Sequence, residues 1–241
     1  MKLIFFLLLF IGNIFAYAAP LQIGVVAFAP PFSSAIGSNN QYYGFCIDLI
    51  NEICTRLQET CQYKLTDLGQ KQLNDLRQGI IDVTFLTSPV RPTNGTDYIY
   101  SLPYIPSRGQ IVVLENSKIN SLDELAGKQI GVFQASALKN TVVSKYTSLN
   151  NIHEYTSMPE MLDALNSHQV DALLINASFA RYLTNNIKRL KLIGHPMELG
   201  MGYGMIALKK NADLINRINK ALLQIEADGT YETIYNKYFG N

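Results

Sequence analysis

The sequence predicts an α/β protein of two lobes, each built on a mostly parallel sheet with helices on both faces. Segments typical of strands alternate with segments typical of helices along the chain, and this alternation implies parallel sheets buried between helices. The alternation falls into two runs, one before and one after about residue 110. No stretch rich in Gly, Ser or Pro separates them, so we expect two lobes joined by chain crossings.

The first run combines short strands of β-branched and small residues with helices that carry an apolar stripe. Its expected elements are, in order, a strand at 22–27, a helix at 46–57, a strand at 63–65, a helix at 70–78 and a buried strand at 80–86. Gly79 is expected to end the second helix, because glycine tolerates the left-handed conformation found after helix C-termini.

The second run repeats this alternation of strands and helices. Strands are expected at 110–114, 129–133, 170–175 and 204–208, and helices at 136–146, 157–166, around 178–183 and at 212–227. Ser121 and Glu124 have the spacing of a capping box, which predicts the start of a further short helix between the first two strands.

The N-terminus has the form of a secretory signal. Lys2 precedes an almost wholly apolar stretch at 3–15, and Ala16-Tyr17-Ala18 places small residues where a signal peptidase cleaves. We expect residues 1–18 to be removed, with no lipid anchor because no cysteine follows the cleavage site. An uncleaved membrane anchor is the alternative, but the apolar stretch is short for a membrane span.

Charge and composition argue against several classes of partner. The chain has 20 basic and 19 acidic residues, and removal of Lys2 would leave 19 of each. A neutral protein has no electrostatic basis for binding nucleic acid or an anionic membrane. No other apolar run approaches membrane-spanning length, so we expect a soluble exported protein.

The last residues carry a family resemblance. The segment 228–240, Asp-Gly-Thr-Tyr-Glu-Thr-Ile-Tyr-Asn-Lys-Tyr-Phe-Gly, resembles the C-terminal signature of the periplasmic amino-acid-binding proteins of ABC importers (family 3 solute-binding proteins). It is most similar to the arginine, lysine/arginine/ornithine and histidine branch. The resemblance covers the whole mature chain and implies a type II periplasmic binding protein fold. It implies one lobe from 19–109 and 196–241, another from 110–195, and hinge crossings near 107–112 and 194–203.

This resemblance also implies a function. Such a protein captures an amino acid by closing its lobes and delivers it from the periplasm to an inner-membrane ABC permease. It acts as a monomer without a cofactor or a metal ion.

The resemblance further implies a disulfide between Cys54 and Cys61, which follow a Gly-Phe-x-x-Asp-Leu helix as in the relatives that bind basic amino acids. They flank a short loop, which suits a bridge in an oxidising compartment. Cys46 would lie about 12 Å from Cys54 along the helix, too far for a bond. We interpret Cys46 as a small buried hydrophobic residue.

The family places an arginine in a Thr-Pro-x-Arg segment, and this chain has Ser88-Pro89-Val90-Arg91. A guanidinium can hold a carboxylate through two parallel hydrogen bonds, so Arg91, with Thr87 and Ser88 beside it, is the candidate for the ligand's α-carboxylate. An ungapped match instead puts Asn94 at the arginine position and the family's polar pair on Leu86 and Thr87. A solvated loop arginine is the structural alternative.

In the second lobe, Ser136 lies where the family has a Gly-Thr-Thr segment between a strand and a helix. It can cap the helix, bind a carboxylate, or do both. Asn176 occupies the position of the family's acid that holds the ligand's α-ammonium group. An asparagine can accept a hydrogen bond but supplies no counter-charge.

The walls around the ligand side chain depart from the family pattern. Val26, Ala29 and Gly69 stand where relatives often carry an acid and two aromatic residues. Phe28, displaced by one position, and Phe32 are the aromatic candidates that remain. Asp67 and Glu198 are acidic candidates by rough location only, and a surface role is the simpler interpretation of both.

The expected ligand is a polar amino acid, with a basic one such as arginine favoured by the branch. A neutral polar amino acid such as glutamine and a ligand that is not an α-amino acid are the alternatives. A secreted dehydratase of cyclohexadienyl or arogenate type is an alternative on the same fold, and a sensor module is another. An enzyme needs a placed acid or base, but Asn176 stands at the acidic position and the three histidines lack metal-ligand spacing. We therefore predict a binding protein without catalytic residues.

Overall fold

A computed structural model describes residues 19–37, 41–85, 90, 95–134 and 151–239. The predicted signal peptide and the helix expected at 136–146 lie outside the described residues. So do four of the candidate site residues, namely Thr87, Ser88, Arg91 and Ser136.

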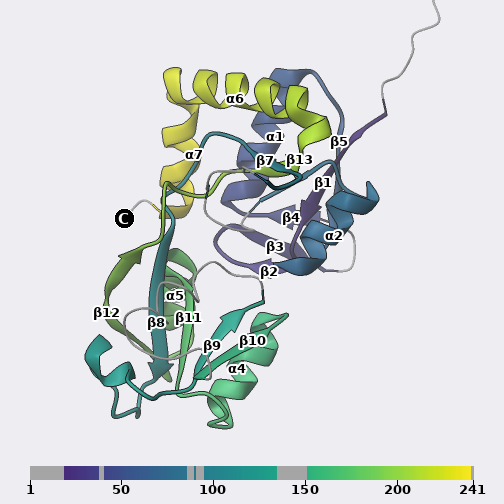
Figure 1. Cartoon of the computed structure of the whole chain (residues 1–241). Helices are drawn as coiled ribbons and strands as arrows, with labels where there is room; N and C mark the ends of the chain where they lie inside the picture. The colour runs from purple at the N-terminus through teal and green to yellow at the C-terminus, as the bar shows by residue number, and fades with distance from the viewer. Residues whose placement is uncertain (1–18, 38–40, 86–89, 91–94, 135–150, 240–241) are drawn as a thin grey trace, which may run out of the picture.

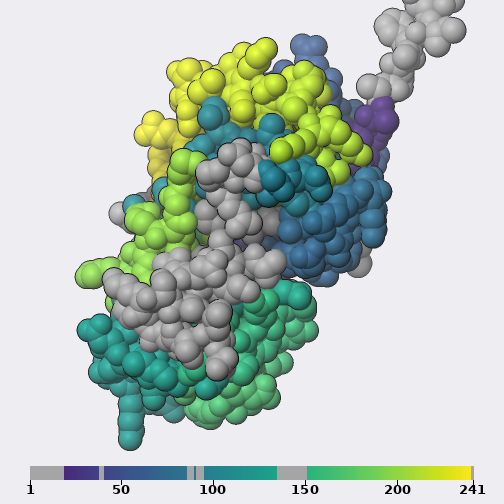
Figure 2. All heavy atoms as spheres, viewed as in Figure 1, coloured from purple at the N-terminus to yellow at the C-terminus, as the bar shows by residue number. Residues whose placement is uncertain are grey.

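Two five-stranded sheets form the centres of two lobes (Figure 1). The first sheet has the order β5-β1-β6-β13-β7 and the second β10-β9-β11-β8-β12. The strands of the first sheet are β1 (Leu21–Val25), β5 (Cys61–Leu65), β6 (Val83–Thr84), β7 (Tyr98–Tyr100) and β13 (Ile206–Leu208). Those of the second are β8 (Arg108–Leu114), β9 (Ile130–Phe133), β10 (Ile152–Tyr155), β11 (Ala172–Asn176) and β12 (Leu190–Glu198). In Figure 2 the purple and yellow ends of the chain share the upper lobe, and teal and green segments build the lower one.

Both sheets are mixed. β1 runs parallel to β5 and β6, whereas β13 runs antiparallel to β6 and β7. The second sheet repeats this division, with β9 parallel to its neighbours and β8 antiparallel to its own. The parallel pairings expected from the sequence thus fill one half of each sheet. The antiparallel half of each sheet consists largely of strands that flank the crossings, which are β7 and β8 at the first and β12 and β13 at the second. The chain leaves the first lobe along one crossing and returns along the other, so the strands at their ends run in opposite directions.

Helices cover both sheets. Those within the described residues are α1 (Phe45–Leu57), α2 (Gln70–Gln78), α4 (Met158–Asn166), α5 (Ala177–Asn186), α6 (Ala212–Ala227) and α7 (Thr230–Phe239), with 3-10 turns at Leu122–Leu125 and Lys209–Asn211. α1 packs against α6 and α7 in the first lobe, and α5 packs against β8 and β12 in the second. A small three-stranded sheet, β2 (Phe28–Ala29), β3 (Ser33–Ile36) and β4 (Gln41–Tyr43), follows β1. Within the described ranges, no helix combines the length and apolar content needed to cross a membrane.

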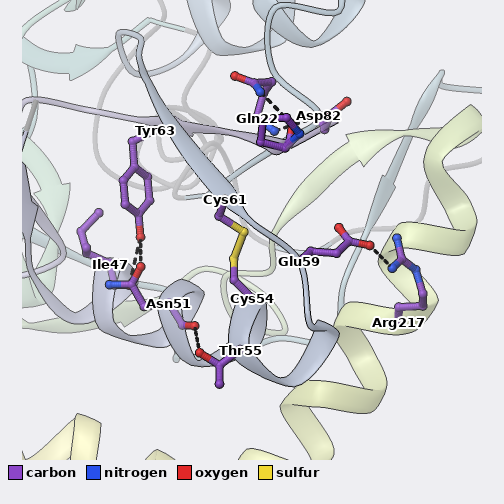
Figure 3. The surroundings of a disulfide bond; sticks show 11 residues. Gln22, Ile47, Asn51, Cys54, Thr55, Glu59, Cys61, Tyr63, Asp82 and Arg217 are labelled. Atoms are coloured by element: carbon purple, nitrogen blue, oxygen red, sulfur yellow. Dashed lines mark hydrogen bonds and ion pairs between the residues drawn. A yellow bond between two sulfur atoms is a disulfide. The ribbon is translucent and has the colours of Figure 1, made fainter. Parts of the chain in front are cut away.

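The predicted disulfide is confirmed. Cys54 and Cys61 are bonded across a Cα–Cα distance of 6.2 Å, and the bond ties the end of α1 to the start of β5 (Figure 3). Cys46 is a free, buried thiol that donates a hydrogen bond to the Tyr104 hydroxyl at 3.8 Å. Burial raises the pKa of the Cys46 thiol, so it stays protonated and behaves as the small hydrophobic residue expected.

Two local expectations are wrong. Over its described residues, 80–85, the expected strand pairs only at Val83–Thr84, because the amides of Ile80 and Ile81 still donate to the Asp75 carbonyl at the end of α2. The expected capping box is absent. Ser121 makes no side-chain cap, and the Glu124 carboxylate instead accepts from the Asn120 amide at 2.8 Å.

The lobes are joined by two crossings that are hydrogen-bonded to each other. The Tyr104 amide donates to the Tyr203 carbonyl at 2.9 Å, and the Tyr203 amide donates to the Ile105 carbonyl at 2.8 Å. The first crossing, 101–107, lies before the segment predicted for it, because β8 already belongs to the second sheet from Arg108. The second, 199–205, overlaps its predicted segment. The predicted lobe bounds stay a proposal.

Candidate functional site

Two consecutive residues of the second crossing anchor the candidate segments of both lobes. The amide of Val90, the residue before Arg91, donates to the Gly202 carbonyl at 2.7 Å. The side chain of the buried Tyr203 lies close enough to the Asn176 side chain, at the end of β11, for Asn176 to lower the pKa of the phenol. The first-lobe segment and the second-lobe asparagine therefore converge on one point of the hinge.

Gly204 allows this convergence. A Cβ at Gly204 would lie 2.7 Å from Cγ2 of Val90 and 2.8 Å from the Ser101 carbonyl oxygen. Both contacts are closer than real Cβ atoms permit, so a side chain there would displace the segment that leads to Arg91. The glycine keeps Val90 packed directly on the returning crossing.

Asn176 ends β11 and caps α5. Its Oδ1 accepts from the amides of Ser178 at 2.9 Å and Phe179 at 3.3 Å. Burial raises the pKa of Tyr203, and the Asn176 side chain lowers it in part, so the phenol remains protonated at neutral pH. Because an amide oxygen has two lone pairs, both acceptor positions of Asn176 are already used by the helix.

Phe28 spans the gap between the lobes. Its ring is 46% exposed, and its centroid lies 6.0 Å from that of Phe179 in α5, in an edge-on contact. Across the small sheet, Phe28 pairs with Ser34 and Ser34 with Tyr43, so the three side chains share one face. This face offers an aromatic wall beside the start of α5.

Phe32 lies in the core of the first lobe. It is 1% exposed, and its ring contacts Phe239 of α7 at 5.7 Å between centroids. The side chains of Val26 and Ala29 are buried as well. Among these neighbouring positions, Phe28 is the aromatic side chain that a small molecule could reach in this conformation.

Gln72 supports the site and was not among the expected residues. This fully buried α2 side chain donates to Thr84 Oγ1 at 2.8 Å and to the Phe85 carbonyl at 3.0 Å. Thr84 in turn donates to the Gly24 carbonyl at 3.0 Å. The network fixes the end of β6, from which the Arg91 segment departs. The sequence signals this role only weakly. Gln72 lies four positions before Leu76 and therefore on the same buried face of the helix, and a single polar residue on that face does not by itself indicate a binding site.

The acidic and imidazole candidates do not form a cluster. Asp67 is exposed, and Glu198 pairs with Arg108 at 2.6 Å on the surface. His153 lies 2.6 Å from Gln129, which is its hydrogen-bond partner. Over the described residues, no set of three His, Cys, Asp or Glu side chains could hold a metal ion.

Comparison with known proteins gives consistent matches over nearly the whole chain. The family described as bacterial extracellular solute-binding proteins, family 3, matches residues 21–241. The lysine/arginine/ornithine-binding periplasmic protein of Escherichia coli (strain K12) is 27% identical over 236 residues, which are 93% of this chain and 90% of that protein. The structure of an arginine third transport system periplasmic binding protein from Legionella pneumophila is 34% identical, with a TM-score of 0.83, covering 92% of this chain and 100% of its own. An ancestral arginine-binding protein bound to glutamine is 30% identical, with a TM-score of 0.78, covering 92% and 98%.

Proposed function

Because this chain belongs to the bacterial extracellular solute-binding proteins of family 3, we propose that it captures a polar amino acid between its lobes and delivers it to the permease of an ABC importer. Arginine is the leading ligand, since similar proteins are named for arginine binding. Glutamine is the alternative, since one similar protein was solved with it. The observation that carries the proposal is the convergence of the Val90 segment and Asn176 on Gly202 and Tyr203.

Capture follows from hinge bending. Two paired crossings allow rigid lobes to rotate toward each other, and a ligand that touches both lobes stabilises the closed form. We assign the α-carboxylate to Arg91, supported by Thr87, Ser88 and Ser136. The exposed Phe28 ring offers a face to the ligand side chain, including a cationic one.

Export and assembly are parts of the same proposal. Residues 1–18 would direct the chain to the periplasm, where the Cys54–Cys61 disulfide persists in an oxidising environment. The mature protein would act as a monomer and meet its permease in the closed form. No cofactor is assigned to it.

A thermal-shift screen of the twenty amino acids tests the proposal. The true ligand should stabilise the protein by about 2.7 kcal/mol at a hundredfold excess over Kd. Its D-enantiomer should give a much smaller shift and serves as the matched control. If no amino acid raises Tm while arogenate or prephenate is consumed, the enzyme alternative is correct instead.

Asn176→Asp is expected to strengthen binding of an α-amino acid severalfold, about three- to tenfold, because a carboxylate can cap α5 with one oxygen and hold the ammonium with the other. Stability should change little, since Asp and Asn are equally good N-caps. Isothermal titration of both proteins with the ligand from the screen measures the change. Weaker binding in the variant would show that the site needs the asparagine amide.

A further inference from the structure

A cavity lies between the lobes, beside the crossings. Its volume is about 360 Å³, and its walls come from α5 of the second lobe, α7 of the first lobe and the crossing itself. Its lining includes Arg181 and Asn185 on α5, Tyr235 and Tyr238 on α7, Ile105 in the first crossing and Arg108 at the start of β8. Cavities of this size accommodate small organic molecules.

The lining of this cavity is rich in hydrogen-bond donors, and none of the described residues that line it carries a carboxylate side chain. Two guanidinium groups line it. Arg108 is paired with Glu198, whereas the exposed Arg181 makes no ion pair with any residue that the structure describes. On the α7 side, the Asp48 carboxylate of α1 accepts from Lys237 and from the Tyr238 hydroxyl, both at 2.7 Å. Among the described residues that line the cavity, the Arg181 guanidinium thus keeps an unpaired positive charge that an occupant could use.

The other walls are apolar. Ile105 is buried and Phe239 is half-buried, and both line the cavity together with Pro106 of the first crossing and Pro196 of β12. We propose that this cavity is a second binding site, for a small organic carboxylate with an aromatic or apolar body. Arg181 would hold the carboxylate through charge-assisted hydrogen bonds, and the prolines and rings would cover the body.

Occupancy of this site should be linked to closure of the lobes, a consequence that rests on the proposed function. Its walls belong to both lobes and to the crossing, so its shape depends on the hinge angle. A ligand that binds one hinge angle better shifts the population toward it, and the effect between two sites is reciprocal. Asn176 lines one edge of the cavity and joins it to the amino-acid site.

The probe for the test is 4-fluorobenzoate, titrated into the mature protein and followed by fluorine NMR. Arg181→Gln should weaken its binding by about tenfold or more, as expected for the loss of a charged hydrogen bond. Arg189→Gln is the matched control, since Arg189 is an exposed arginine of the same lobe outside the cavity. Equal binding by both variants, or no binding by the wild type, overturns the proposal.

A second variant tests the site without removing a charge. Asn185→Trp would narrow the cavity and introduce the protein's first tryptophan, so 4-fluorobenzoate should either be excluded or change the indole emission. Unchanged emission together with unchanged affinity would show that the probe binds elsewhere.

The two proposed sites can be separated by Arg91→Ala. Binding of 4-fluorobenzoate should survive this substitution, and its loss would place the probe in the amino-acid site. Saturation with the amino acid found in the screen should change the affinity for 4-fluorobenzoate at least threefold, and an unchanged affinity overturns the linkage. If no amino acid stabilises the protein in the thermal-shift screen but 4-fluorobenzoate still binds in an Arg181-dependent way, only the proposed function is rejected.

Discussion

Replacing Arg91 by alanine is expected to weaken binding of the amino acid by at least about a hundredfold. The guanidinium is proposed to pair with a carboxylate that is enclosed when the lobes close. Truncating one partner of such a buried charge pair costs about 2–5 kcal/mol, and each 1.4 kcal/mol is about tenfold in Kd. Isothermal titration with the ligand identified by thermal shift measures the loss.

Two further variants make this result specific. Arg91→Lys keeps the charge but cannot form the two parallel hydrogen bonds, so its affinity should lie between those of the wild type and the alanine variant. Asn94→Ala should leave affinity nearly unchanged if Arg91 holds the carboxylate. A hundredfold loss for Asn94→Ala with none for Arg91→Ala would instead support the ungapped match of this segment to the family.

The sequence predicts the helices best, because their signals are local. α2 spans the predicted residues and ends at Gly79, whose φ of 70° is the left-handed conformation that glycine favours. α6 also has its predicted bounds, which follow from a regular apolar stripe over sixteen residues. In both cases the pattern that predicts the helix lies within the helix and the residues next to it.

The small strands were not predicted, because tertiary pairing rather than local pattern creates them. β2 and β3 flank a Pro-Pro pair, β2 has only two residues and β3 begins with two adjacent serines, so no apolar–polar alternation marks them. β12 is interrupted by a bulge between Ile193 and Met197, where Gly194 has a φ of 67°. A register shift of this kind breaks the period of two on which strand prediction relies.

In the candidate site, too, some features can be predicted from the sequence and others depend on the tertiary structure. The family resemblance points to Asn176 because it matches the position of the acid that holds the ligand's α-ammonium group. It does not show that both lone pairs of its oxygen are used by the α5 amides, because that depends on the side-chain rotamer. Phe28 and Phe32 are four residues apart and look equivalent in sequence. The fold exposes one ring to the gap between the lobes and buries the other against α7.

Replacing Phe45 by alanine is expected to lower the free energy of unfolding by about 3–5 kcal/mol, the usual cost of removing a buried phenylalanine. Phe45 is fully buried at the start of α1. Its ring centroid lies 6.2 Å from that of Tyr104 in the first crossing and 5.2 Å from that of Phe239 in α7. One side chain thus packs a helix, the hinge and the C-terminal helix together.

The backbone at the start of α1 has little freedom to move. Gly44, the residue before α1, has a φ of 132°, and a Cβ there would lie 2.4 Å from the Phe32 carbonyl oxygen. The start of α1 is therefore fixed against the turn after β2, and the space left by Phe45→Ala cannot be filled by a small shift of the helix. Urea denaturation followed by circular dichroism measures the loss.

Phe28→Ala is the matched control, because it removes the same side chain from a position that is 46% exposed. It should lower the free energy of unfolding by less than about 1 kcal/mol, since much of the Phe28 ring is already exposed to water in the folded protein and little buried apolar surface is lost. If the two variants were equally stable, the aromatic cluster around Phe45 would not hold the C-terminal helix to the hinge. If Phe45→Ala also weakens amino-acid binding in the folded protein, the change acts through Tyr104, whose amide pairs the first crossing with Tyr203 of the second.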